Sequence, residues 1–380
     1  MSSFESEYNT ILGQLESSPF RHYLERIKSK SVNRPIILYG AGMAVGIILH
    51  VCRANNINIT LLCDSNKTGR YKQSDVSLPI ISPQELVEKH SDSSVIVTSW
   101  KFEKEIRENL KSIGFDDNNV FSFYYPQRIT PKIFQKDYYD GYKWAYDFYE
   151  DEISKQLVLD KIKSYLTSEP LKPNTGRNIY SEDVFKFGED EVLLDGAYDE
   201  DIIKNVNAFS NITKGRYKYI YVFKPENDTL KSDLDNYGNV EIFSLGLGSN
   251  ERVETFFYNG LLSSGFVSCK YYATTEHKFS STEFKTTEKN VVSIDGLIEK
   301  GIIKHTPTFI KLDIEGSEAD ALIGAADLIK NHKPKLAICA YHQPQDVYEL
   351  PEIILSIRDD YKFMLRQHDY GYYETLLYAY

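Results

Sequence analysis

Short apolar runs alternate with helix-length stretches along most of the chain. In the first third, four runs have the length of a buried strand: RPIILYG, NITLLCD, SVIVTSW and NVFSFYY. The stretches that separate them are long enough for helices and carry apolar residues at helical spacing. This order is typical of β-α-β units, so we expect a small parallel-sheet domain over residues 31–125.

A second series of strand candidates begins near residue 190. It comprises EVLLD, YKYIYVF, NVEIFSLG, NVVSI, TFIKLD, KLAICA, YKFMLR and ETLLYAY. The last two are separated only by a short turn segment, which predicts an antiparallel hairpin at one edge of the sheet. We therefore expect an α/β protein with four segments: an N-terminal helical segment (1–30), the small parallel-sheet domain (31–125), a helical connector (126–182) and a larger α/β domain (183–380).

The stretch after TFIKLD shows the helical periodicity clearly. One face of the predicted helix is apolar and contains Ala319, Leu322, Ile323, Ala326 and Ile329. The preceding strand ends in Asp313, so this acid should lie at the carboxyl edge of the sheet. Open α/β sheets bind their ligands at that edge, which makes Asp313 a candidate functional residue.

Composition and charge limit the possible partners. The chain has 380 residues, 42% of them hydrophobic and 26% charged, as expected for a globular protein of two domains. A formal net charge of −11 argues against duplex nucleic acid as the main partner and favours a small or glycan substrate. The chain shows neither a secretory signal nor an apolar run of membrane-spanning length, so we expect a cytoplasmic protein. Whether it forms a homo-oligomer stays open.

The cysteines do not suggest a metal site or a redox motif. Cys52, Cys63, Cys269 and Cys339 are far apart and form no C-x-x-C pair. No other ligand spacing specifies a metal, so none is predicted, and the thiols are interpreted as buried packing residues.

A glycine-rich turn in the front domain resembles a dinucleotide fingerprint. Gly40, Gly42 and Gly46 follow the first strand candidate, and Asp64 ends the second. The third glycine is one place late for G-x-G-x-x-G. Binding of a dinucleotide or nucleotide-sugar is one interpretation of this Rossmann-like pattern, and a noncatalytic docking role is the other.

The carboxy-terminal motifs resemble the FkbM family of methyltransferases. The acid-rich turn D-x-E-G-x-E is present from Asp313 to Glu318, the Y-H pair as Tyr341-His342, and the H…E-T-x-L-Y hairpin from His368 through Glu374 to Tyr378. Upstream, LLDGAYDED and VVSIDGLIE resemble two further family segments. The similarity spans roughly residues 121 to 380.

This resemblance implies a seven-stranded class I methyltransferase (Rossmann-like) domain that ends in an antiparallel hairpin. It also implies S-adenosylmethionine as the cofactor and methyl transfer to a hydroxyl, often of a sugar, in polysaccharide or secondary-metabolite biosynthesis. The residues expected to bind the cofactor are Asp195, Gly196, Ala197, Tyr198, Asp199, Glu226, Gly246 and Leu247.

Two departures from the family pattern affect the expected cofactor site. Glu200 replaces a glycine of the first loop, and Lys224 stands where the family usually has a glutamate that accepts hydrogen bonds from ribose. Glu226, two residues further on, could replace that glutamate if the strand continues. The alternative function is therefore a degenerate methyltransferase domain that binds a glycan or nucleotide-sugar.

Transfer to a hydroxyl needs a group that removes a proton, and His342 and Asp313 are the candidates for this catalytic role. Each also has a structural interpretation, since His342 could simply cap the following loop. Four further residues are candidate substrate ligands, although they could equally cap a helix or stabilise the hairpin: Glu315, Glu318, His368 and Glu374.

Overall fold

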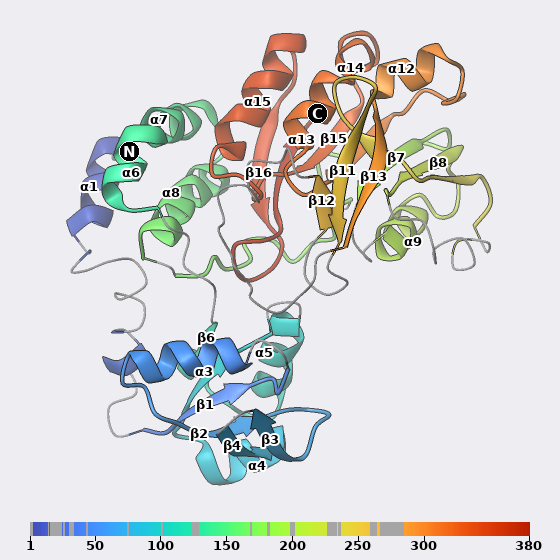
Figure 1. Cartoon of the computed structure of the whole chain (residues 1–380). Coiled ribbons are helices and arrows are strands. Elements are labelled where there is room, and N and C mark those ends of the chain that lie inside the picture. Colours follow the sequence, from blue (N-terminus) through green and yellow to red (C-terminus); the bar gives the residue numbers. More distant parts are fainter. Residues whose placement is uncertain are drawn as a thin grey trace. The chain divides into compact units, whose positions relative to one another are not determined.

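The computed structural model divides the chain into two compact units (Figure 1). Unit 1 comprises Met1–Asp137, Leu159–Lys172 and Asp369–Tyr372, and unit 2 comprises Tyr138–Val158, Pro173–His368 and Tyr373–Tyr380. The structure describes residues 3–13, 15, 25, 27–29, 34–42, 45–73, 76–99, 102–122, 129–167, 169–180, 183–197, 202–225, 234, 237–258, 264–266 and 285–380.

Unit 1 is built around a six-stranded sheet. Its helices and strands are α1 (Phe4–Gly13), β1 (Ile36–Tyr39), α3 (Val45–Ala54), β2 (Ile59–Cys63), β3 (Gly69–Gln73), β4 (Val76–Ile81), α4 (Pro83–His90), β5 (Ser94–Val97), α5 (Glu103–Ser112), η2 (Asp117–Asn119), β6 (Val120–Ser122) and α6 (Pro131–Asp137). The strand order is β3-β4-β2-β1-β5-β6. All neighbours run parallel except β3 and β4, which form an antiparallel pair.

Strand alternation gives this sheet an apolar core on each face. Leu38 of β1 packs in the cluster that contains Val45 and Leu49 of α3. The next residue, Tyr39, packs on the opposite face in the cluster that contains Leu86 of α4. The predicted parallel sheet is therefore present, with β3 and β4 as two strands that were not predicted. The polar sequence of β3, GRYKQ, and the proline in that of β4, VSLPII, did not indicate strands.

Unit 2 contains the seven-stranded sheet that the sequence predicts. Its strands are β7 (Val192–Ala197), β8 (Tyr219–Phe223), β9 (Val240–Phe243), β14 (Phe309–Asp313), β15 (Lys335–Cys339), β16 (Phe363–Gln367) and β17 (Thr375–Ala379). The order is β16-β17-β15-β14-β7-β8-β9, and only β17 runs antiparallel to its neighbours. Five neighbouring strands, β15, β14, β7, β8 and β9, pair in parallel, and their carboxyl ends consequently share one edge.

Helices cover this sheet. They are α7 (Tyr139–Phe148), α8 (Glu152–Thr167, which contributes to both units), α9 (Ile202–Ile212), α12 (Ile294–Glu299), α13 (Glu318–Ile323), α14 (Ala326–His332) and α15 (Asp346–Ile357). Helix α9 packs on β7, whereas α15 contacts β17 and the helices α7, α13 and α14. Every residue of β14 is buried, as expected for a central strand covered on both faces. No helix in the described ranges is both long and apolar enough to cross a bilayer.

A second, four-stranded sheet in unit 2 was not predicted. It has the order β10-β13-β11-β12, with β10 (Gly246–Leu247), β11 (Arg252–Tyr258), β12 (Ser264–Phe266) and β13 (Lys285–Val292). The run NVVSI, expected as a strand of the main sheet, instead ends β13, which pairs antiparallel with β11. The sequence around β11 was not recognised as a strand because RVETFFY mixes charged and aromatic residues without an apolar run.

Glu191 connects the amino-terminal ends of three neighbouring strands. Its carboxylate accepts hydrogen bonds from the Thr308 hydroxyl before β14 and, at 2.8 Å, from Lys335 Nζ in β15. It also accepts one from the Gly188 backbone at 3.0 Å. Burial alone would raise the pKa of Glu191, but Lys335, Thr308 and Gly188 stabilise the charged form, and the pKa lies below its ordinary value of 4.5.

We expect Glu191→Gln to lower the free energy of unfolding by about 1–3 kcal/mol at pH 7, because it removes a buried charged acceptor from its three donors. The pKa of Glu191 is lower in the folded chain than its ordinary value. The stabilisation is therefore fully present at a pH above the ordinary pKa, and it is lost as the pH falls through the lower pKa of the folded chain. Denaturant unfolding from pH 7 to pH 3 would measure it, with the exposed Glu189→Gln as the control. A difference between wild type and Glu191→Gln that does not shrink with acid would contradict this account.

Candidate functional site

A buried group of charged residues lies at the carboxyl edge of the main sheet. The core residue Phe309, Lys311 and Asp313 occupy every second position of β14, so their side chains leave the same face of the strand. Asp195 of β7 is the register partner of Lys311. Lys311 Nζ lies 3.3 Å from Asp313 Oδ2 and 4.0 Å from Asp195 Oδ1. One buried cation therefore stands between two buried carboxylates.

Asp313 is held as an anion by this environment. Its Oδ1 accepts a 2.9 Å hydrogen bond from the hydroxyl of Tyr341, which follows β15. Burial works against the charged carboxylate, but Lys311, His342 and the Tyr341 hydroxyl outweigh it and lower the pKa of Asp313 to about 2. Asp313 is 8% exposed, so it is nearly but not fully enclosed.

The turn after Asp313 directs two more acids toward the same place. Glu315 and Gly316 have φ angles of 58° and 95°, which gives the chain a tight left-handed bend directly after the strand. Glu318, at the start of α13, reaches back and accepts a 2.8 Å hydrogen bond from the Ile314 backbone. Glu318 thus closes the turn, as its structural interpretation requires, and is also 99% buried beside His342.

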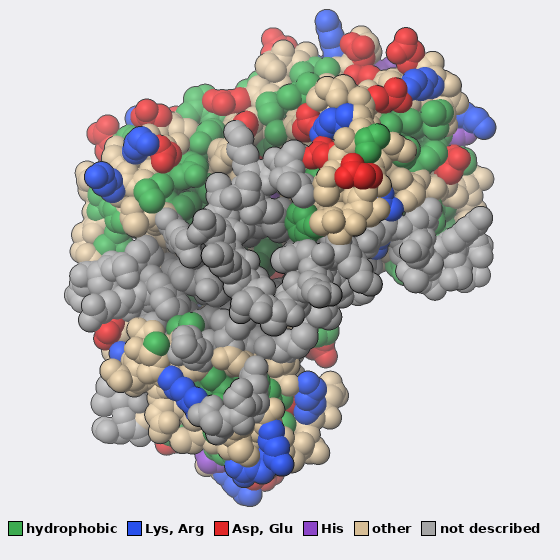
Figure 2. Space-filling model, viewed as in Figure 1, with side chains coloured by type: hydrophobic (Ala, Val, Ile, Leu, Met, Phe, Trp, Pro, Cys, Tyr) green, Lys and Arg blue, Asp and Glu red, His purple; other side chains and the backbone are tan. Residues whose placement is uncertain are grey.

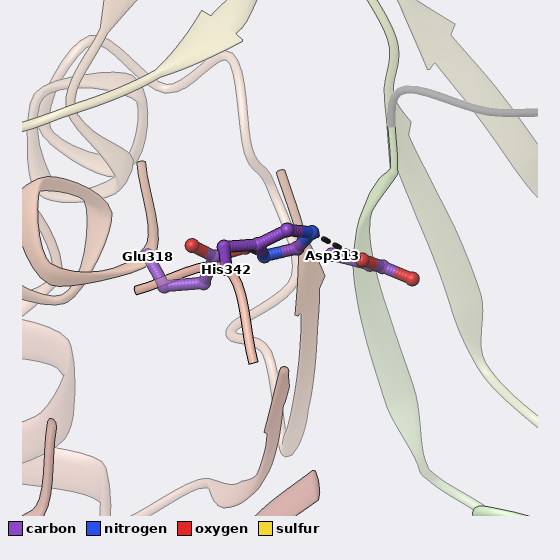
Figure 3. Close-up of side chains that lie close together, drawn as sticks. All are labelled: Asp313, Glu318 and His342. Carbon is purple, nitrogen blue, oxygen red and sulfur yellow. Dashed lines mark ion pairs between the residues drawn. The ribbon is translucent and has the colours of Figure 1, made fainter. Parts of the chain in front are cut away.

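Figure 3 shows the imidazole of His342 between the carboxylates of Glu318 and Asp313. His342 Nδ1 lies 3.0 Å from Glu318 Oε1, and Nε2 lies 3.6 Å from both Asp313 Oδ1 and Glu315 Oε2. Burial lowers the pKa of His342, but Glu318, Glu315 and Asp313 outweigh it and raise the pKa to about 10. The ring is therefore positively charged at neutral pH.

A small pocket of about 50 Å³ opens beside this group. Its lining includes Lys311, Asp313 and Glu374, together with Lys204 and Asn205 of α9. Asn205 is 6% exposed, and its Nδ2 has no hydrogen-bond partner among the described residues. The pocket thus offers both donors and acceptors of hydrogen bonds.

His368 and Glu374, both predicted to contact substrate, lie at the base of the terminal hairpin. His368 Nε2 is 2.7 Å from the Tyr378 hydroxyl, and its Nδ1 is 3.1 Å from the Arg177 carbonyl. These contacts fix the hairpin, which matches the structural interpretation of His368. Glu374 instead lines the pocket and has a left-handed backbone, with φ of 61°.

The residues predicted to bind the cofactor are only partly described. Gly196 is closely packed, since a Cβ there would lie 3.0 Å from Leu247 Cδ1 and 3.1 Å from Leu312 Cδ2. Gly246 packs under Phe266, whose ring a Cβ would overlap at 2.4 Å. Tyr198, Asp199, Glu200 and Glu226 lie outside the described residues. Lys224 is half-buried at the end of β8.

In unit 1, the carboxylate of Asp64 accepts hydrogen bonds from the backbone of neighbouring turns. Its Oδ2 accepts a 2.7 Å hydrogen bond from the Ala41 backbone, and its Oδ1 accepts 2.8 Å bonds from Asn66 and Lys67. Gly40 adopts φ of 109°, and a Cβ there would meet Thr98 Oγ1 at 2.6 Å. The contacts within this turn are thus sufficient to account for a glycine at position 40 and an acid at position 64. Gly42 lies in the same turn, and Gly46 lies inside α3.

Comparison with known families identifies the larger unit. Residues 196–372 match the model of the Methyltransferase FkbM domain. This part of the chain is an FkbM methyltransferase domain. Residues 32–121 match a model described as C2185-like, N-terminal. No curated protein matches the chain significantly.

The FkbM domain also has a solved structural counterpart. The crystal structure of Methyltransferase FkbM from Methylobacillus flagellatus KT aligns with a TM-score of 0.59, covering 98% of this chain and 99% of that chain. At 20% sequence identity, this likeness shows a common fold and nothing finer.

Sequence reasoning identified Asp313, Glu315, Glu318 and His342, which the FkbM domain brings together, but it missed Lys311. A signal was present, because a lysine in the otherwise apolar run TFIKLD, two residues before an acid, must share a face with that acid.

Lys311→Met should lower the free energy of unfolding of the FkbM domain by about 3–5 kcal/mol, because it leaves two buried carboxylates without their cation. Adding Asp195→Asn should restore part of this loss. Denaturant unfolding measures both effects, and the exposed Lys330→Met serves as a control, expected to change stability by at most about 0.5 kcal/mol. Equal stabilities for Lys311→Met and wild type would show that the buried charges are not coupled.

Proposed function

We propose that the FkbM domain is an S-adenosylmethionine-dependent O-methyltransferase that acts on a hydroxyl of a sugar or glycan. The observation that carries the proposal is the position of Asp313, an anion held at the carboxyl edge of a methyltransferase sheet beside a pocket of mixed polarity. Open α/β sheets bind their ligands at this edge.

The described residues suit this cofactor in their backbone arrangement. The carboxyl ends of β7, β8 and β9 are adjacent, with Gly196 at the end of β7. When bound, S-adenosylmethionine supplies a methyl group on a positively charged sulfur. We propose that the backbone at Gly196 and Ala197, with Gly246 and Leu247, lies along it.

The charged contacts of the cofactor must then come from other residues. Asp195 is fully buried and faces Lys311, so it is unsuited to meet the cofactor's ammonium group. Lys224, at the end of β8, cannot accept hydrogen bonds from ribose. Asp199 and Glu226 are acids in the segments that follow β7 and β8, and we propose them, together with the neighbouring Tyr198, for these contacts.

Asp313 is the better candidate to receive the proton of the acceptor hydroxyl. An imidazole that is already protonated cannot accept a second proton, and three carboxylates stabilise the charged form of His342. Asp313 is ionised and lines the pocket. We propose that His342, with Glu318 behind it, positions Asp313.

A glycan acceptor is consistent with the charges around the site. The pocket combines lysine and asparagine donors with the carboxylates of Asp313 and Glu374, a mixture that matches a group of hydroxyls rather than an anion. On the face of unit 2 visible in Figure 2, acidic and basic side chains are interspersed. We propose that Glu315 also contacts this acceptor.

Calorimetric titration with S-adenosylmethionine tests the proposal. We expect wild type to bind and Glu226→Gln to bind about ten- to a hundredfold more weakly, because a charged acceptor is lost. Glu288→Gln, an exposed acid on β13, is the matched control and should bind as wild type does.

Absence of binding by wild type at millimolar cofactor would refute the enzymatic proposal and favour the degenerate, glycan-binding alternative. Lys224→Glu tests the role of Lys224 in either case. If wild type does not bind, binding by this variant would show that Lys224 disables the site. If wild type does bind, weaker binding by the variant would show that Lys224 belongs to a working site.

A further inference from the structure

The cluster around His342 has more acidic groups than its hydrogen bonds explain. Asp313, Glu315 and Glu318 each place a carboxylate oxygen within 3.6 Å of a ring nitrogen. Glu318 is 1% exposed and His342 is 4% exposed. Three carboxylates around one enclosed imidazole give this point of the FkbM domain an excess of negative charge even when the ring is protonated.

Two of the enclosed atoms have no hydrogen-bond partner in the described part of the chain. They are Glu318 Oε2 and His342 Nδ1. Although Nδ1 lies 3.0 Å from Glu318 Oε1, the contact does not have hydrogen-bond geometry. A buried polar atom without a partner costs about 1–3 kcal/mol, so two such atoms on neighbouring side chains indicate that a partner is missing.

The spacing of these side chains suits a metal ion. Asp313, Glu318 and His342 each offer one ligand atom, and these atoms lie within 4.8 Å of one another. Bonds of about 2.1 Å to nitrogen and oxygen hold two ligands of one ion at most about 4.2 Å apart. Small rotations of the three side chains would therefore close the site.

We propose that Asp313, Glu318 and His342 bind a divalent transition-metal ion, which takes the place of a proton on the imidazole ring. Glu315 supplies an additional carboxylate beside it. One imidazole and two carboxylates form a mixed set of ligands that suits Mn²⁺, Fe²⁺ or Zn²⁺ better than Ca²⁺, which takes oxygen ligands alone. Ligand spacing in the sequence predicted no metal here. Tertiary folding assembles the set, because the end of β14, the start of α13 and the loop after β15 meet at this point.

Electron paramagnetic resonance with Mn²⁺ tests the site without the cofactor or an acceptor. Free Mn²⁺ gives a strong spectrum that is lost on binding, so a titration of the full chain yields stoichiometry and affinity. We expect one Mn²⁺ per chain, displaced by Zn²⁺. His342→Gln and Glu318→Gln should each weaken binding at least tenfold, whereas the exposed His332→Gln and Glu288→Gln should bind as wild type does.

A wild-type chain that leaves the Mn²⁺ spectrum unchanged and does not retain Zn²⁺ on dialysis would overturn the inference. So would His342→Gln and Glu318→Gln variants that bind as tightly as wild type. If these buried variants do not fold, Glu315→Gln replaces them, since its side chain is 21% exposed, and it should weaken binding measurably. The proposed function has a separate test, because it would be refuted by the absence of cofactor binding in the calorimetric titration.

Discussion

The buried ammonium of Lys311 is the interaction on which the site depends. Asp195 and Asp313 lie on neighbouring strands and face the same side of the sheet, where two enclosed carboxylates would repel each other. Lys311 lies between them and allows both to remain charged. Because its partner in the strand register is Asp195, the pairing of β7 with β14 and the charge state of the site are set by the same contact. A slip of one residue would turn Lys311 to the other face.

The acids of the turn after β14 add further negative charge next to this group, around His342. Glu318 holds the turn through the Ile314 backbone and also faces the imidazole of His342, so one side chain sets both the bend and the ring's surroundings. The left-handed Glu315 brings its own carboxylate to the other side of the ring. In the motif from Asp313 to Glu318, the capping interpretation and the functional interpretation are therefore compatible. The same oxygen of Glu318 closes the turn and lies beside His342.

Much of this arrangement could be predicted from the sequence. The apolar runs predicted the strands of the main sheet, the short turn predicted the terminal hairpin, and the position of Asp313 at a strand end predicted its edge of the sheet. The four-stranded sheet was missed because β11 and the first part of β13 carry charged and polar residues instead of an apolar run, so only the end of β13 was recognised as a strand. Lys311 was missed although one of its partners, Asp313, lies two residues on. Its other partner, Asp195, lies more than a hundred residues away in the sequence, so only the fold shows that two carboxylates flank the lysine.

Asp64 and Asp313 show why a strand-end acid predicts a place but not a role. Both lie at the carboxyl end of a strand in a sheet that is largely parallel. Asp64 has its carboxylate oxygens bonded to three backbone amides of adjacent turns, which leaves little capacity for a ligand. Asp313 is held by the side chains of Lys311 and Tyr341 instead and lines a pocket. Backbone donors fix Asp64 as part of a turn, whereas side-chain donors from separate elements hold Asp313 at the point where those elements meet, beside the pocket.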